Sequence, residues 1–168
     1  LKDSQLARDF IIRLCGNPVL GILTGTVFTM LIQSSSASVG IVIVLAANGL
    51  IPFEGALYLV FGDNIGTTIT AWMAGIGSNS TARRVAMVHT MFNAIGTIVF
   101  GLLTYIGVYT LIINRITPCN VLLGENVARH VANGHTFFNV FNTIIFLPFA
   151  GLLARIATKI IPPDKEET

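Results

Sequence analysis

Charged residues are the scarcest feature of this sequence. Of its 168 residues, 11% are Asp, Glu, Lys or Arg and 53% are hydrophobic, whereas an ordinary soluble domain is about 25% charged. Across residues 14–114 the formally charged side chains are Glu54, Asp63, Arg83 and Arg84. A water-facing surface cannot be built from so few charges, which excludes a secreted domain, a cytosolic enzyme and a nucleic-acid-binding protein.

Cysteine is also scarce, and the patterns of metal and hydrolase sites are missing. Cys15 and Cys119 lack metal-ligand spacing, and a pairing between them cannot be deduced from sequence. The sequence holds no His-Glu-x-x-His pattern. No predicted strand could carry the nucleophile of a Ser-His-Asp hydrolase. We therefore expect a protein that is not an enzyme and needs no cofactor.

Long apolar runs make up most of this charge-poor sequence, and they predict an all-α integral membrane protein. A membrane core about 30 Å thick needs about 20 apolar residues per helix. We expect an interfacial amphipathic helix over 1–16, a membrane domain over 17–161 and a polar tail over 162–168. Two uninterrupted helices are predicted over roughly 85–113 and 130–161.

The charge-free run 18–48 has a polar centre, which is the wrong chemistry for a single span. Gln33, Ser34, Ser35 and Ser36 lie almost midway along it. A re-entrant hairpin of two half-length helices meeting at this polar tip accounts better for the pattern, because irregular backbone at depth is tolerated where it lines a cavity. Small residues on both arms, including Gly21, Gly25 and Gly40, are expected to let the arms pack closely.

The same tip is a candidate anion site. Unpaired backbone N–H groups at the start of the second arm favour an anion, and the serine hydroxyls add donors for phosphate-like oxygens. The alternative is that the serines only join helices, as Ser and Thr often do in membranes.

A second polar segment interrupts the apolar run 55–77 and predicts a broken helix. It reads Gly-Asp-Asn-Ile-Gly-Thr-Thr over 62–68. The carboxylate of Asp63, the amide of Asn64, the hydroxyls of Thr67 and Thr68 and freed backbone carbonyls are ligands suited to sodium. An intramembrane acid is by default a functional candidate; the alternative is a carboxylate held by neighbouring amides or waters.

The two long helices contain a duplication. Residues 82–100 and 128–146 are identical at 11 of 19 positions with an offset of 46, and both contain His-Thr-x-Phe-Asn. If each helix crosses once, the copies run in opposite directions, an inverted repeat typical of secondary transporters. The pairs His89/Asn93 and His135/Asn139 are candidate residues lining a transport path, or else simple interhelical contacts.

These motifs together resemble the sodium–phosphate cotransporter domain family, the type II sodium/phosphate symporters and their bacterial relatives. The resemblance rests on QSSSAS at 33–38, GDNIGTTITA at 62–71, ARRVAMVHTMFN at 82–93 and NGHTFFNVFNTIIFLPF at 133–149. It implies sodium-coupled symport of inorganic phosphate, with phosphate held at Gln33 and Ser34 to Ser36. It also implies that the QSSS tip helps to hold sodium, so Gln33 and Ser36 join the 62–68 segment as candidate sodium ligands.

The sequence departs from this family pattern in two ways. The family usually has Ala or Ser at the position of Asp63, and its members carry two QSSS repeats where this chain has one. We therefore expect half of an inverted-repeat transporter, with the second repeat supplied by the rest of a longer polypeptide or by a second copy. Sodium is the expected coupling ion and the bacterial inner membrane the expected location. A proton-coupled anion transporter and a phosphate sensor or channel remain the alternatives.

Overall fold

A computed structural model describes residue 11, residues 13–118 and residues 126–164, and the elements within them are helices. The predicted 1–16 helix, Cys119 and the last residues of the polar tail therefore lie largely or wholly outside the described part. The helices are α2 (Pro18–Ile32), α3 (Ser35–Ala47), α4 (Phe53–Thr67), α5 (Ile69–Gly75), α6 (Ser80–Tyr105), α7 (Val108–Ile116), α8 (Val127–Phe146), the 3-10 turn η2 (Leu147–Phe149) and α9 (Ala150–Ile160).

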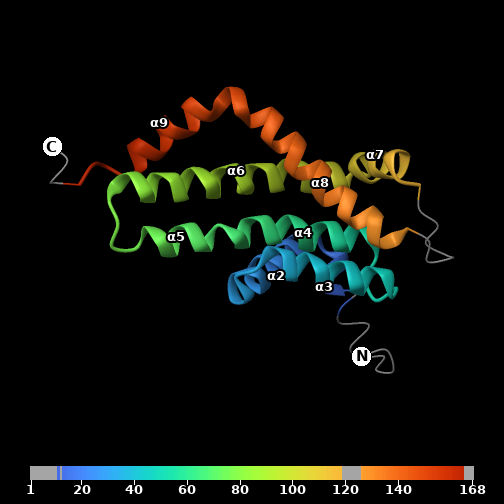
Figure 1. Cartoon of the computed structure of the whole chain (residues 1–168). Coiled ribbons are helices and arrows are strands. Elements are labelled where there is room, and N and C mark those ends of the chain that lie inside the picture. Colours follow the sequence, from blue (N-terminus) through green and yellow to red (C-terminus); the bar gives the residue numbers. More distant parts are fainter. Residues whose placement is uncertain (1–10, 12, 119–125, 165–168) are drawn as a thin grey trace.

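The helices are arranged in layers around α4 (Figure 1). The α4–α5 segment runs alongside α6, α2 and α3 lie against α4 on one side, and α8 and α9 arch over α6. Aromatic side chains of α4, α6, α7 and α8, among them Phe61, Phe100, Tyr109 and Phe138, form a buried cluster where these layers meet. This core fixes the position of α4 relative to α6 and α8.

The polar run at 33–38 divides its segment into two helices, as the sequence predicts. Gln33 ends α2 in the left-handed conformation (φ 57°), and its N–H donates to the Thr29 carbonyl at 2.7 Å. Ser34 caps the start of α3, where its hydroxyl accepts from the N–H of Ala37 at 3.4 Å. The re-entrant position of this helix pair in a membrane stays a prediction.

The expected role of the small residues between the two arms is wrong. The glycines of α2 face α4 instead of α3: a Cβ at Gly25 would lie 2.0 Å from the Leu59 carbonyl oxygen, and one at Gly21 would lie 2.8 Å from the Cβ of Tyr58. A Cβ at Gly40 would meet nothing within 4 Å. Helix α2 therefore packs closely on α4, with which it makes the most extensive contact between helices of the described chain.

The helix breaks also differ from the prediction in position. Residues 62–67 continue α4, and the interruption is confined to Thr68 before α5 begins. The two long helices are not uninterrupted: α6 ends at Tyr105 before Gly107 (φ 81°), and α8 gives way to a 3-10 turn containing Pro148. Proline lacks the N–H that would continue the helix, which explains the second break.

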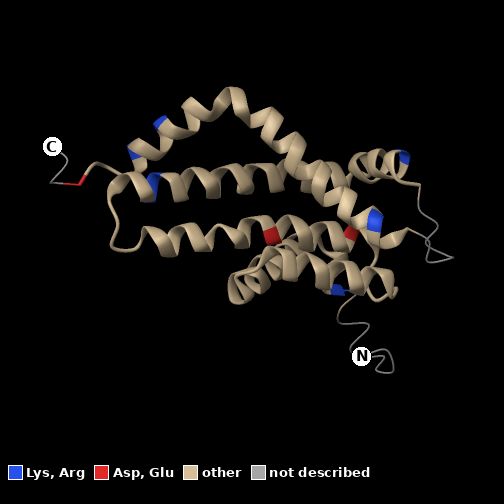
Figure 2. Cartoon of the chain, in the orientation of Figure 1, with Lys and Arg blue, Asp and Glu red and all other residues tan. Residues whose placement is uncertain are grey.

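Among the described residues, two segments are long and apolar enough to cross a membrane. They are Ser80–Tyr105 and Val127–Ile160, the second including the break at 147–149. Figure 2 shows basic residues at the ends of the helix assembly and an acidic position in its middle stretch, on α4. Basic residues gathered at the ends of apolar helices are typical of membrane proteins, whereas an acid in the middle of one is rare and points to a function.

Candidate functional site

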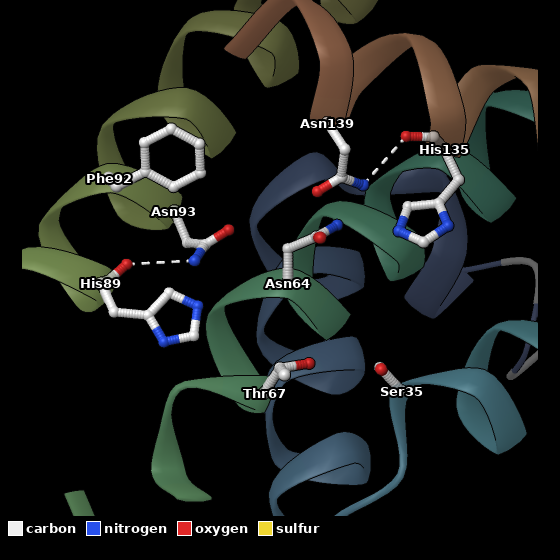
Figure 3. A pocket seen from close by; sticks show the side chains of 8 residues that line it. All are labelled: Ser35, Asn64, Thr67, His89, Phe92, Asn93, His135 and Asn139. Carbon is white, nitrogen blue, oxygen red and sulfur yellow. Dashed lines mark hydrogen bonds between the residues drawn. The ribbon is translucent and has the colours of Figure 1, made fainter. Parts of the chain in front are cut away.

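A polar pocket of about 310 Å³ lies between α3, α4, α6 and α8. Figure 3 shows His89 and His135 on opposite sides of it, with Asn64, Thr67 and Ser35 between them. The pocket brings together one residue of the 33–36 run, two of the 62–68 segment and both copies of the His-Thr-x-Phe-Asn motif. Its lining is Ser35, Asn64, Thr67, His89, Phe92, Asn93, His135 and Asn139.

The three asparagines of the pocket are oriented by their own helices. In each, the side-chain Nδ2 donates to the backbone carbonyl four residues earlier: Asn64 to Val60 at 2.8 Å, Asn93 to His89 at 3.0 Å and Asn139 to His135 at 3.0 Å. A carbonyl oxygen can only accept, so the nitrogen must face it. The amide oxygens of Asn93 and Asn139 consequently point away from these carbonyls, towards the space between the helices (Figure 3).

The hydroxyl of Thr67 is held in the same way. It donates to the Asp63 carbonyl at 2.8 Å, which leaves the lone pairs of Oγ1 available to a ligand. Thr68 and Thr70 likewise donate to the carbonyls of Ile65 and Thr67. The carbonyls of Asp63, Ile65 and Thr67 are therefore not freed as expected, because the helix continues to Thr67 and threonine hydroxyls donate to them.

Five of the predicted site residues do not line this pocket. Gln33, Ser34 and Ser36 are exposed at the junction of α2 and α3. Thr68 is buried at the end of α4, and Asp63 is fully buried. One residue of the QSSS run, Ser35, thus contacts the pocket within this chain.

Asp63 belongs to a separate buried network that joins three helices. The Thr29 hydroxyl of α2 lies 2.7 Å from Asp63 Oδ1 and 2.8 Å from the Ser38 hydroxyl of α3. All three side chains are at most 1% exposed, and Asp63 Oδ2 has no hydrogen-bond partner among the described residues. A buried carboxylate with a free oxygen is available to bind a cation or to carry a proton.

Sequence reasoning missed Thr29, Ser38 and Phe92 as members of these sites. Thr29 lies four residues before Gln33 on α2, and Ser38 lies four residues after Ser34 on the next helix. Both residues are therefore one helical turn from the polar tip, and this spacing is the feature of the sequence that could have indicated them. Phe92 lies within the duplicated motif, beside the candidate residue Asn93.

The fold and the pocket are those expected of a helical membrane protein with a polar site between its helices. A family model described as Na⁺/Pi-cotransporter matches residues 4–117. The chain belongs to this Na⁺/Pi-cotransporter family.

Three of the proteins to which the chain is similar each match about half of its length. It is 40% identical over 75 residues to the uncharacterized protein YqeW of Bacillus subtilis, covering 45% of this chain and 24% of that protein. It is 37% identical over 89 residues to the sodium-dependent phosphate transport protein 2B of Homo sapiens, covering 49% and 13%. It is 38% identical over 86 residues to the putative inorganic phosphate export protein YjbB of Salmonella typhimurium, covering 51% and 16%.

The match thus spans about a quarter or less of the length of each of these relatives. No solved structure gives a significant match to the chain.

Proposed function

We propose that this chain is one half of a membrane symporter that moves inorganic phosphate together with sodium. The observation that carries the proposal is the pocket between α3, α4, α6 and α8, where all three polar motifs of the sequence contribute side chains. Family membership supports phosphate as the substrate, since relatives carry the name of sodium-dependent phosphate transport proteins.

The pocket offers chemistry for both ions. The Ser35 hydroxyl and the ring N–H groups of His89 and His135 are donors that suit phosphate oxygens. The amide oxygens of Asn64, Asn93 and Asn139 and the Thr67 hydroxyl are neutral oxygen ligands that suit sodium. Binding the two ions side by side neutralises charge that would otherwise be expensive within a membrane.

Asp63 contributes to the proposed sodium binding through its charge, although it does not line the pocket. It is adjacent to Asn64 in α4 and holds a fully buried carboxylate with one unpaired oxygen. Thr68, at the end of the same helix, stays part of the proposed sodium site. The carboxylate would favour a cation nearby even though it does not line the pocket itself.

The second QSSS repeat is the proposed partner of the exposed tip. Gln33, Ser34 and Ser36 are exposed on this chain, so they are free to contact another repeat that brings its own polar tip. In this arrangement they complete phosphate and sodium binding. The partner repeat comes from the rest of a longer polypeptide or from a second copy, in what we infer to be the bacterial inner membrane.

Uptake of radiolabelled phosphate into proteoliposomes containing the full-length polypeptide tests the proposal. We expect uptake to rise severalfold when an inward sodium gradient replaces an equal potassium gradient. Uptake driven equally well by a proton gradient without sodium would instead indicate a proton-coupled transporter. Phosphate flux that never exceeds equilibrium, or binding without flux, would indicate a channel or a sensor.

A further inference from the structure

The contacts between α6 and α8 follow a regular antiparallel register. Phe92 packs against Phe146 (ring centroids 5.6 Å apart, interplanar angle 71°), and Phe100 packs against Phe138 (5.2 Å, 71°). Midway between these two contacts, Gly96 faces Asn142. Each step of four residues forward along α6 is therefore matched by four residues back along α8, as Figure 1 also shows from the opposite courses of the helices.

The sequence duplication exchanges these contacts with one another. With the offset of 46 residues, Phe92 corresponds to Phe138 and Phe100 to Phe146. The Phe92–Phe146 contact therefore corresponds to the Phe138–Phe100 contact, which has the same residue types and the same interplanar angle. The same offset relates Gly96 to Asn142, so the Gly96–Asn142 contact corresponds to itself with its two residues exchanged. This is what a two-fold axis through that contact would do.

Contacts at the helix ends support the same axis independently. Arg84 and His130 occupy equivalent positions in the two copies. Arg84 Nε donates to the carbonyl of Ile161, just after α9, and His130 Nδ1 lies 2.8 Å from the carbonyl of Thr117, just after α7. Each long helix is therefore tied near its start to the end of the short helix that follows the other long helix.

We propose that α6–α7 and α8–α9 are inverted copies of one unit, related by a local two-fold axis through Gly96 and Asn142. Asn142 is then a positioning residue that sets the separation of α6 and α8, and with it the two His–Asn walls of the pocket. It is fully buried, its Nδ2 donates to the Phe92 carbonyl at 3.3 Å, and a Cβ at Gly96 would lie 2.3–2.5 Å from its amide atoms. The arrangement holds independently of which ion is moved.

Exchanging the two residues at the axis tests the proposal. Gly96→Asn alone places two amides in one space, and Asn142→Gly alone leaves a cavity. Each single change should lower the unfolding midpoint of the purified protein in detergent by about 4–8 °C. In the double variant G96N/N142G the introduced amide can donate to the Phe138 carbonyl, the equivalent of Phe92, so most of the loss should be recovered.

The readouts separate this proposal from the proposed function. Gly101→Ala is the matched control on α6, because its Cβ would meet only Ile22 Cδ1 at 3.5 Å, and it should leave the midpoint nearly unchanged.

For a positioning role, the half-saturating phosphate concentration should rise at least threefold in each single variant and return towards the parent value in the double variant. A double variant no more stable than the worse single variant overturns the proposal, and this outcome does not depend on transport. If the parent protein moves no phosphate, the proposed function fails while the unfolding data still decide the two-fold arrangement.

Discussion

Ser35 is the residue of the polar run that contributes to the pocket, and the start of α3 explains why. Ser34 uses its hydroxyl to cap this helix, and Gln33 ends the preceding one. Ser35 and Ser36 are the first helical residues and point about 100° apart around the axis. The half-buried Ser35 lines the pocket while Ser36 is exposed, so the serines of one motif have different tasks.

Replacing Ser35 by alanine should therefore weaken phosphate transport. A hydrogen bond to a charged group contributes about 1.5–3 kcal/mol, so we expect the half-saturating phosphate concentration to rise about tenfold or more. Ser78→Ala, in the exposed turn before α6, is the control and should leave it unchanged. Equal kinetics in the Ser35→Ala and Ser78→Ala variants would remove Ser35 from the proposed phosphate site.

Replacing Asp63 by alanine should raise the sodium concentration needed for half-maximal transport. The buried carboxylate has a free oxygen and lies next to the sodium ligands proposed in α4. Sodium activation curves for the parent and for Asp63→Ala measure the effect, and Asp63→Asn, which keeps the shape, separates charge from packing. Sodium dependence that is the same in all three proteins would show that Asp63 has a structural role.

Thr29 supplies the hydrogen-bond donor that this carboxylate needs. Thr29→Val keeps the side-chain shape but leaves Asp63 Oδ1 without the Thr29 hydroxyl at 2.7 Å. An unsatisfied buried acceptor costs about 1–3 kcal/mol, so the unfolding midpoint in detergent should fall. Thr158→Val, at an exposed position on α9, is the control. Equal midpoints in both variants would show that the Thr29 hydrogen bond adds nothing to stability.

At the scale of elements, the closest helix contact is the one between α2 and α4. The approach is reciprocal: a Cβ at Gly25 would lie 2.0 Å from the Leu59 carbonyl oxygen, and a Cβ at Gly62 would lie 2.0 Å from the Ile22 carbonyl oxygen. Small residues four or so apart on both helices allow such approach in membranes. The glycines of the 62–68 segment therefore allow α2 to pack closely on α4, which remains helical through Thr67.

Gly25→Ala and Gly62→Ala should each destabilise the protein strongly. Because the obstructing atoms are backbone, the helices must move apart, at a cost of at least about 1–3 kcal/mol. The measurement is the yield of monodisperse protein and its unfolding midpoint in detergent. Gly40→Ala, with open space around its Cβ, is the control and should be tolerated. Equal behaviour of the three variants would contradict the close contact of α2 and α4.

At the scale of the whole molecule, the exposed tip is what we expect if this chain forms half of a transporter, as proposed above. If two copies pair through their tips, the initial uptake rate at low protein density should rise with the square of the protein-to-lipid ratio. We expect this dependence when residues 1–168 alone are reconstituted, because the proposed site needs two QSSS tips. A rate that rises linearly at densities where cross-linking finds the chain monomeric would show that a single copy transports phosphate.

The sequence by itself determined the class of the protein and singled out most of the residues that line the polar pocket. Scarce charge and long apolar runs predict membrane helices, and the polar run at 33–36 predicts the end of one helix and the start of the next. The polar motifs identified Ser35, Asn64, Thr67 and the two His–Asn pairs, because polar side chains in apolar helices are costly without a purpose.

The tertiary structure alone decided which of these polar residues meet and which helix packs on which. Asp63 and Asn64 are neighbours in sequence, yet one joins a buried network with Thr29 and the other lines the pocket, because successive helical residues point in different directions. A glycine pattern likewise shows that another helix can approach closely, but it does not show which helix that is. Partner choice depends on how all the helices fill space together, and no local pattern contains that information.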